Sequence, residues 1–373
     1  MKVPLADLHA QYLTIKEEID TSIRSVIESS QYILGSAVHD FEASFALAHG
    51  VKHCVAVGSG TDALHLALWA MEIGQGHGVI TTPFTFIATI EAISLSGAQT
   101  IFVDIDPRTF TMDPERLSSL LQGSPRHRSI KAIIPVHLYG QAAAMDEINE
   151  IAGAHRLGII EDACQAHLSL YDGKCVGNFG ASACFSFYPG KNLGAYGEAG
   201  AVVTNDDQIA LKVRRLRDHG QVEKYKHQLL GHNYRMDGIQ GAVLGVKLRH
   251  LDQWTARRRA IARMYRTLLS GAGDLVLPFE SPKAHHVYHL FVVRTKSRPA
   301  LQQYLSEKSI ATGIAYPIPL HFQEACRHLG YSEGDFPASE AAAQECLSLP
   351  LYPEMSDDQV EFVASSVRSF FKH

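Results

Sequence analysis

SACFSFYPGKNLGAYGEAGAVVT, residues 182–204, contains a lysine in a glycine-rich turn between two apolar runs. The first run, 182–187, is typical of a short buried strand that ends at Pro189. Lys191 therefore lies at a turn, close to packed backbone. Burial or a nearby cation lowers the pKa of such a lysine, and the uncharged amine can then form a Schiff base with a carbonyl compound. A solvated turn lysine is the alternative that this stretch alone leaves open.

Outward from this stretch, apolar strand-like runs alternate with helical segments between residues 51 and 217. This alternation predicts a largely parallel sheet that is covered by helices on both faces. In sheets of this kind, ligands bind at the carboxyl ends of the strands. The residues that fall there are Gly60, Thr61, Phe86, His137, Asp162, Gln165 and Lys191.

The segment VKHCVAVGSGTDALHLALWAMEI, residues 51–73, is typical of a strand, a glycine turn and a helix. A helix N-terminus after a glycine-rich turn offers free N–H groups and a positive dipole end, so it suits a phosphate group. Gly58, Gly60 and Ala63 also fit a dinucleotide fingerprint. That alternative requires an acidic residue at the end of the next strand, where the sequence has TTPF instead.

Two further residues have both a structural and a functional interpretation. Asp162 ends the buried run LGII, where it either caps the following segment or holds a charged ligand group. Phe86 lies at a predicted helix start, where it either packs in the core or stacks on a planar cofactor.

Five motifs occur in a fixed order along the chain: SGTDAL, PFTF, EDACQAH, SFYPGKN and GHNYRM. Together they resemble the DegT/DnrJ/EryC1/StrS family of sugar aminotransferases, which use pyridoxal 5'-phosphate. The resemblance implies an α/β protein with the aspartate aminotransferase fold (fold type I), whose mostly parallel mixed sheet is flanked by helices. It also implies a large cofactor-binding domain with an N-terminal helical segment, residues 1–250, and a smaller C-terminal α+β domain, residues 251–373.

The resemblance implies a role for each matching residue. Lys191 would form the Schiff base and then move protons, and Asp162 would pair with the pyridine nitrogen. The expected cofactor contacts are the stacking ring of Phe86, the amide of Gln165 on the phenolic oxygen, and Gly60, Thr61 and Ser186 on the phosphate. Asn233, in GHNYRM, would reach the cofactor phosphate of the partner chain in a homodimer with shared active sites.

The same likeness suggests the substrates. HGQVEKYKH, which contains Tyr225, resembles the branch of the family that aminates 3-keto sugar nucleotides, and further expected substrate contacts are Tyr32, Tyr316 and His321. We therefore expect an amino group to move from L-glutamate to a nucleotide-linked, dTDP-type 3-keto-6-deoxyhexose. The alternatives are a 4-keto-sugar aminotransferase and a non-catalytic regulator that binds the cofactor or a sugar nucleotide. A dehydratase with histidine in place of the lysine is disfavoured by Lys191.

Composition and charge exclude several other classes of protein. The net charge of −5 lacks the basic excess expected of a nucleic-acid-binding protein. The six cysteines form no CxxC pair, and the N-terminus has no apolar signal core, so we expect a cytoplasmic protein without a membrane segment. His285 and His289 are potential metal ligands, but a metal site would need a third ligand, so no metal is expected.

The C-terminal third of the chain yields coarser expectations. The pattern predicts one long helix over residues 236–269, with Arg257, Arg258, Arg259 and Arg263 on a solvated face. Strands are expected in HHVYHLFVVRT, with His285 and His289 on one face, and around Ile314. Helices are expected over residues 300–309 and 338–348 and from residue 356 onward.

Overall fold

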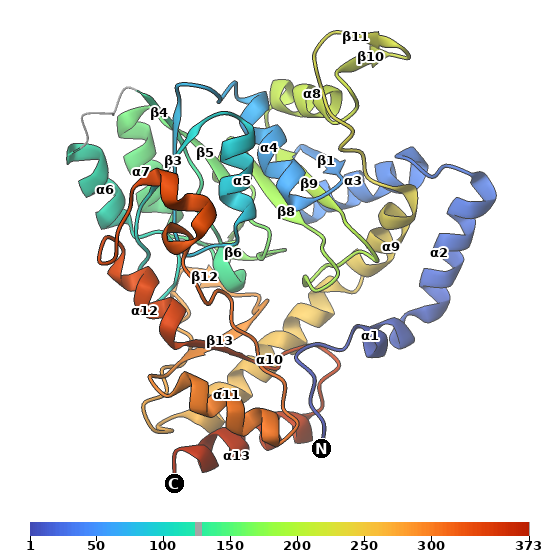
Figure 1. Cartoon of the computed structure of the whole chain (residues 1–373). Coiled ribbons are helices and arrows are strands. Elements are labelled where there is room, and N and C mark those ends of the chain that lie inside the picture. Colours follow the sequence, from blue (N-terminus) through green and yellow to red (C-terminus); the bar gives the residue numbers. More distant parts are fainter. Residues whose placement is uncertain (124–128, 373) are drawn as a thin grey trace.

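A computed structural model describes residues 1–123 and 129–372. A seven-stranded sheet forms its centre, with helices on both faces (Figure 1). Six strands run parallel, and β9 alone is antiparallel to both of its neighbours. In spatial order the strands are β1 (His53–Val57), β9 (Gly200–Thr204), β8 (Ser182–Ser186), β5 (Gly158–Asp162), β4 (Ile130–Ile133), β2 (Gly78–Thr81) and β3 (Gln99–Phe102). The predicted mixed sheet is thereby confirmed.

The strands of this sheet are buried because helices cover both faces. One face packs against α4 (Gly60–Ala70), α5 (Ala88–Leu95) and α8 (Asp207–Leu216). The other face packs against α3 (Gly35–His49), α6 (Pro114–Gly123), α7 (Met145–His155) and α9 (Gly238–Leu248). Burial on both faces explains why the strands are continuous apolar runs without alternation.

The register of β5 against β8 determines where the functional residues lie. Asp162 pairs with Cys184 in parallel, so the two strands end at the same edge of the sheet. The turn that carries Lys191 follows β8 directly. A glycine is required where α4 approaches this edge, because a Cβ at Gly60 would lie 2.7 Å from the Cβ of Ser186.

The C-terminal part of the chain has its own hydrophobic cluster, which includes Ile261, Tyr265, Phe291, Leu347 and Val363. Its elements are α10 (Leu251–Leu269), β13 (Phe291–Arg294), α11 (Arg298–Glu307), η3 (Leu320–Phe322), η4 (Glu324–Leu329), α12 (Pro337–Glu345), β14 (Cys346–Leu349) and α13 (Asp357–Phe370). The predicted domain boundary at residue 250 falls between α9 and α10, and the division into two domains stays a prediction.

Shorter elements complete the chain. The N-terminal helices α1 (Leu8–Thr14) and α2 (Lys16–Ser29) lie beside α9 and α10, and the hairpin β10 (Gln221–Glu223) and β11 (Lys226–His227) projects from the body (Figure 1). A small sheet joins β12 (Ala284–His285) to β6 (Leu170–Tyr171) and β7 (Lys174–Cys175), and η2 (Leu138–Gly140) follows β4.

Two helix predictions were wrong. The expected helix 236–269 is two helices, α9 and α10, separated at Arg249 and His250, both of which bind Glu18 of α2. The break contains neither proline nor glycine, and the contact with Glu18 spans more than 200 positions, so the local pattern did not reveal it. The expected helix 338–348 ends at Glu345, because the next four residues pair with β13 as buried strand β14.

The structure contradicts three other local predictions. The segment around Ile314 forms an isolated bridge from Gly313 to Ser348 in place of a strand. His289 lies outside β12, so it shares no strand face with His285. The arginine-rich face of α10 is not simply solvated, because Arg258 is buried and donates to the carbonyl oxygen of Leu351 at 3.0 Å.

Candidate active site

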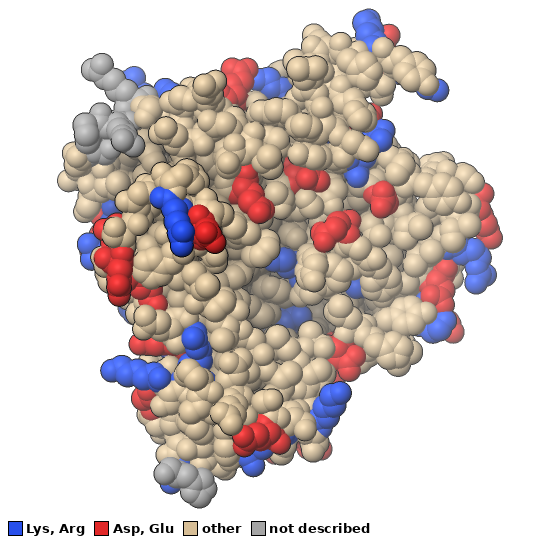
Figure 2. Space-filling model, viewed as in Figure 1, with Lys and Arg blue, Asp and Glu red and all other residues tan. Residues whose placement is uncertain are grey.

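A cavity of about 760 Å³ opens at the carboxyl edge of the large sheet. Figure 2 shows charges of both signs distributed over one face of the molecule, with a hollow near its centre. Eight predicted site residues line the cavity, and they come from five separate segments of the chain. They are Gly60, Thr61, Phe86, Asp162, Gln165, Ser186, Lys191 and Tyr316.

One end of the cavity is the N-terminus of α4. The side chain of Ser59 caps this helix by accepting a hydrogen bond from the Asp62 N–H at 3.1 Å. The first N–H groups of a helix have no partners within it, and the helix dipole adds positive character there. Gly60 and Thr61 therefore offer backbone donors beside the Ser186 hydroxyl. This end of the cavity suits a phosphate group.

Lys191 lines the same cavity from the turn that follows β8. Its turn is fixed by two backbone bonds, from Lys191 N to Tyr188 O and from Ala195 N to Phe187 O, each 2.8 Å long. Burial lowers the pKa of the Lys191 ammonium, although electrostatic interactions with its neighbours Cys164 and Asp162 oppose that shift. A lysine with a lowered pKa has a larger uncharged fraction at neutral pH and is a better nucleophile.

Asp162 forms the floor of the cavity and is only 5% exposed. Thr89 Oγ1 donates to Asp162 Oδ2 at 2.8 Å, and the N–H of Cys164 donates to Oδ1 at 3.2 Å. Since the Thr89 hydrogen is used in this way, Thr85 Oγ1, 3.1 Å from Thr89 Oγ1, is the donor to Thr89. Two hydroxyl groups in series thus hold the carboxylate in one orientation.

Gln165 joins the floor of the cavity to its aromatic wall. Its Oε1 accepts the N–H of Tyr139 at 2.8 Å, and its Nε2 donates to the Tyr316 hydroxyl at 2.9 Å. The rings of Tyr316 and Phe86 lie 5.9 Å apart, and Phe86 is 55% exposed. An exposed ring at this position offers a stacking surface for a planar ligand.

Four predicted residues lie outside the cavity of the single chain. Tyr32 and Tyr225 are exposed, the latter in the projecting hairpin. Asn233 is exposed, and its Oδ1 accepts from Arg235 Nε. The side chain of His321 is buried, 3.1 Å from Glu340.

Several residues of the cavity were not predicted from the sequence. Thr85, which precedes α5, and Thr89 are four positions apart, a spacing that could have indicated a common face in the predicted helix. His289 lies in the wall, and burial, followed by the charge of Lys191, lowers its pKa well below the usual value. Nothing near His289 in the sequence indicates that it lies near Lys191. Other unpredicted lining residues are Cys164, Tyr188 and Glu198.

The part of the chain that the structure describes contains neither a cluster of metal-ligating side chains nor a membrane-spanning helix. Residues 1–123 and 129–372 contain no group of three or more His, Cys, Asp or Glu side chains arranged to hold a metal ion. Within the same ranges, none of the helices combines the length and apolar character that crossing a bilayer requires.

Comparison with known proteins places the chain in a family. Residues 13–368 match the model of the DegT/DnrJ/EryC1/StrS aminotransferase family. The chain is 47% identical to a protein of Geobacillus stearothermophilus named "Pleiotropic regulatory protein", over 100% of both chains. It is 42% identical to dTDP-3-amino-3,4,6-trideoxy-alpha-D-glucose transaminase of Streptomyces venezuelae, over 99% of this chain and 96% of the other. It is 41% identical to UDP-N-acetyl-3-dehydro-alpha-D-glucosamine 3-aminotransferase of Acidithiobacillus ferrooxidans, over 98% and 97%.

Solved structures agree with these relatives. DesV of S. venezuelae, described in complex with a ketimine intermediate, superimposes with a TM-score of 0.96 at 41% identity, covering 100% of this chain and 99% of that one. A Bacillus subtilis protein, NtdA, described with bound cofactor PMP, has a TM-score of 0.91 at 30% identity, covering 100% and 86%.

The cavity of this chain fits the cofactor of these proteins. The close approach of Gly60 to Ser186 leaves no space for a side chain at the helix end, so the backbone itself faces the phosphate position. The chemistry of the lining residues also fits, since the Lys191 amine, the Asp162 carboxylate and the exposed ring of Phe86 all line one cavity. The chain belongs to the DegT/DnrJ/EryC1/StrS aminotransferase family and is a pyridoxal-phosphate-dependent aminotransferase.

Proposed function

We propose that this aminotransferase moves an amino group from L-glutamate to a dTDP-linked 3-keto-6-deoxyhexose. The observation that carries the proposal is that Lys191 and Asp162, 29 positions apart in the sequence, line one cavity beside the N-terminus of α4. Bound pyridoxal phosphate supplies an aldehyde that accepts the amino group and a ring that withdraws electrons.

Lys191 has two tasks in this proposal. Its amine, which burial shifts toward the uncharged form, holds the cofactor until the donor amine displaces it. The released amine then takes a proton from the donor carbon and returns it at a neighbouring carbon, as general base and then as general acid. Transfer to the keto sugar uses the same proton steps in reverse order.

Asp162 and its neighbours would keep the cofactor ring oriented and able to withdraw electrons. The Asp162 carboxylate is aligned by Thr89 and the Cys164 N–H, and it would hold a proton at the ring nitrogen of the bound cofactor. Gln165 would donate to the phenolic oxygen of the cofactor through its amide NH₂ group, and Phe86 would offer a stacking surface to the ring. Asp162, Gln165 and Tyr139 are buried, so their side chains have little contact with bulk solvent.

The choice of a sugar nucleotide rests on the relatives. Proteins 41–42% identical to this chain are named for amination at C3 of dTDP-linked and UDP-linked sugars. We favour the dTDP-linked 3-keto sugar because the segment HGQVEKYKH resembles the branch that acts on 3-keto sugars. A UDP-linked or 4-keto sugar is the alternative substrate, and a regulatory role is the alternative suggested by the name of the 47% identical relative.

Purified protein loaded with pyridoxal phosphate tests this function. The proposal predicts a yellow protein whose visible absorbance falls with L-glutamate and returns on adding a dTDP-linked 3-keto sugar. A panel of dTDP- and UDP-linked 3-keto and 4-keto sugars identifies the acceptor. Recovery with 4-keto sugars alone would overturn the substrate assignment. A protein that binds sugar nucleotides without spectral recovery would favour the regulator.

We also propose a homodimer in which each chain completes the site of its partner. Asn233 is exposed outside the cavity, and the hairpin β10–β11 and the segment that follows it expose apolar side chains, with Tyr225 82% and Leu230 93% accessible. Such surfaces are typical of protein interfaces. Mixing Lys191→Ala chains with Asn233→Ala chains gives heterodimers in which one site carries both substitutions and the other carries neither. Activity that neither parent has would support shared sites, and unrecovered activity would contradict them.

Two further proposals concern organisation and location. We propose that residues 1–250 and 251–373 are separate domains, because the hydrophobic cluster of the C-terminal part draws most of its members from residues 261–367. We assign the protein to the cytoplasm, since all six cysteines are free thiols, as is usual in a reducing compartment.

A further inference from the structure

Glu161 precedes Asp162 on β5, and the chemistry described above does not use it. Successive residues of a strand point to opposite faces, so Asp162 lines the cavity whereas Glu161 is fully buried on the other side. Oε1 of Glu161 accepts the N–H groups of Phe179 and Gly180, each at 2.8 Å. Oε2 accepts the Gly177 N–H at 2.8 Å and His137 Nε2 at 3.0 Å.

Four N–H donors around one carboxylate keep it ionised. Burial alone would raise the pKa of Glu161, but the hydrogen bonds from His137 and from the backbone at Gly177 and Gly180 outweigh burial and lower the pKa. A buried anion with all four contacts made is a rigid point in the fold.

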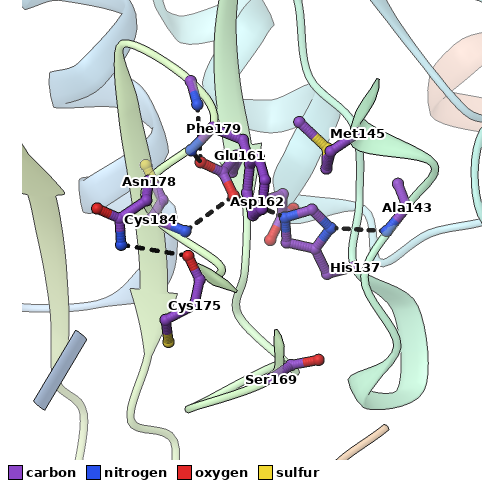
Figure 3. A network of polar contacts seen from close by, with 12 residues as sticks. His137, Ala143, Met145, Glu161, Asp162, Ser169, Cys175, Asn178, Phe179 and Cys184 are labelled. Atoms are coloured by element: carbon purple, nitrogen blue, oxygen red, sulfur yellow. Dashed lines mark hydrogen bonds and ion pairs between the residues drawn. The ribbon is translucent and has the colours of Figure 1, made fainter. Parts of the chain in front are cut away.

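The partner His137 has one defined tautomer. Its Nδ1 accepts the N–H of Ala143 at 3.0 Å, so Nδ1 carries no proton and Nε2 is the donor to Glu161. Figure 3 shows the His137 ring between Glu161 and Ala143, with both contacts drawn. Glu161 therefore selects the tautomer that His137 needs in order to bind Ala143.

The segment 137–143, which lies between the Glu161 and Ala143 contacts, extends to the proposed cofactor site. His137 N donates to Asp162 O at 2.9 Å, and the chain then turns through Tyr139, which has a φ of 58°. The N–H of Tyr139 binds Gln165 Oε1 at 2.8 Å. Because Oε1 is used in this bond, the amide NH₂ of Gln165 faces the cavity and Tyr316.

We propose that Glu161 is a positioning residue: through neutral His137 and the turn 137–143, it determines that Gln165 presents its NH₂ group to the cofactor. The inference deepens the proposed function, since it rests on the contact assigned to Gln165.

Glu161→Gln is the informative substitution because it keeps the shape of the side chain. Each oxygen of Glu161 faces two N–H donors, so either orientation of the new amide places its NH₂ against donors. When the NH₂ faces His137, the ring must move its proton to Nδ1 and loses Ala143. When the NH₂ faces Phe179 and Gly180, two backbone donors lose their acceptor.

A double-mutant cycle with Gln165→Ala measures the connection. The readout is the dissociation constant of pyridoxal phosphate, measured by titrating apo-enzyme. We expect Glu161→Gln to weaken binding by about tenfold in the wild-type background and by less than about twofold when Gln165 is already alanine. Equal weakening in both backgrounds, or no weakening in either, would overturn the inference.

Glu42→Gln is the matched control. Glu42 is also buried and also accepts a backbone N–H, that of Ala56 at 2.8 Å, but it lies outside the cavity wall and pairs with Arg217. We expect this variant to lose thermal stability while its effect on cofactor binding is the same in both Gln165 backgrounds. Non-additivity for Glu42 equal to that for Glu161 would show a general loss of structure, and the inference would fail.

A second variant and a second readout keep the test decisive. If Glu161→Gln does not fold, His137→Gln can place its NH₂ group at the Nε2 position facing Glu161 but then has no acceptor at the Nδ1 position facing Ala143, and the same cycle applies. Nitrogen NMR of histidine-labelled apo-enzyme reports the tautomer directly, and we expect Nε2–H at His137 in the wild type. An Nδ1–H tautomer there would contradict the inference. Neither measurement uses a sugar, so the sugar panel tests the proposed function independently.

Discussion

Replacing Gly60 with alanine tests whether the N-terminus of α4 holds the cofactor phosphate. The new Cβ would lie 2.7 Å from Ser186 Cβ and 3.1 Å from Cys164 Sγ. Carbon atoms in contact are separated by about 3.5–4.0 Å, so α4 and the end of β8 must move apart by about 1 Å. The backbone N–H groups and the Ser186 hydroxyl would then no longer converge on one phosphate.

The magnitude follows from the size of this clash. Overpacking by one methyl group costs about 1–3 kcal/mol. If opening the phosphate site relieves this strain, the same free energy is lost from cofactor binding. Since about 1.4 kcal/mol corresponds to a factor of ten, cofactor affinity should fall by about 5- to 150-fold. The assay is a titration of apo-enzyme with pyridoxal phosphate, followed by visible absorbance and accompanied by a thermal melt.

Gly153→Ala is the control for this substitution. Gly153 lies within α7, and an added Cβ there has no neighbour within 4 Å. Alanine should stabilise that helix by about 1 kcal/mol and leave cofactor affinity unchanged. A Gly60→Ala protein that binds the cofactor as tightly as the wild type would refute the placement of the phosphate at α4.

Three further predictions concern stability. Thr89→Val removes the hydroxyl that donates to buried Asp162, so the free energy of unfolding of apo-enzyme, measured in urea, should fall by about 1.5–3 kcal/mol. Thr89→Ser keeps the hydroxyl and should retain most of that stability. An equal loss in both variants would argue against the hydrogen bond. Burial lowers the pKa of Lys191, so the folded chain binds fewer protons than the unfolded chain as pH approaches 10.5. Lys191→Met should therefore be more stable than wild-type apo-enzyme at pH 7, with a difference that shrinks as pH rises, and a difference that grows would contradict the shift. Burial lowers the pKa of His49 from 6.5 to about 4, so the stability that it confers above pH 6.5 is lost as pH falls toward 4, by roughly 3 kcal/mol in total. His49→Phe should flatten that part of the profile in urea unfolding at several pH values, and an unchanged slope would exclude His49 as its source.

The sequence predicted the site well where reactive side chains lie at the ends of strands that are parallel neighbours. The apolar run 182–187 corresponds to β8, and β8 and its parallel neighbour β5 end at one edge of the sheet, so residues at these strand ends converge without knowledge of the loops. Lys191, Asp162 and Gln165 were predicted to lie at this edge of the sheet, and they line one cavity.

The residues that the sequence did not reveal act through distant contacts. Nothing local to Glu161 in the sequence indicates its role, because its contact with His137 spans 24 positions and its backbone partners lie in a later loop. His289 reaches the cavity through a turn between β12 and β13 that the apolar pattern had assigned to a strand. The break between α9 and α10 and the strand β14 were missed because partners from other parts of the chain override local helical preference.

Borohydride reduction followed by peptide mapping tests the central claim most directly. The enzyme is loaded with pyridoxal phosphate, reduced and digested, and the labelled peptide is identified by mass. Our account predicts that the phosphopyridoxyl group is attached to Lys191 and that Lys191→Ala chains carry no label. A label on another lysine, or a wild-type protein that remains unlabelled while it holds the cofactor, would contradict it.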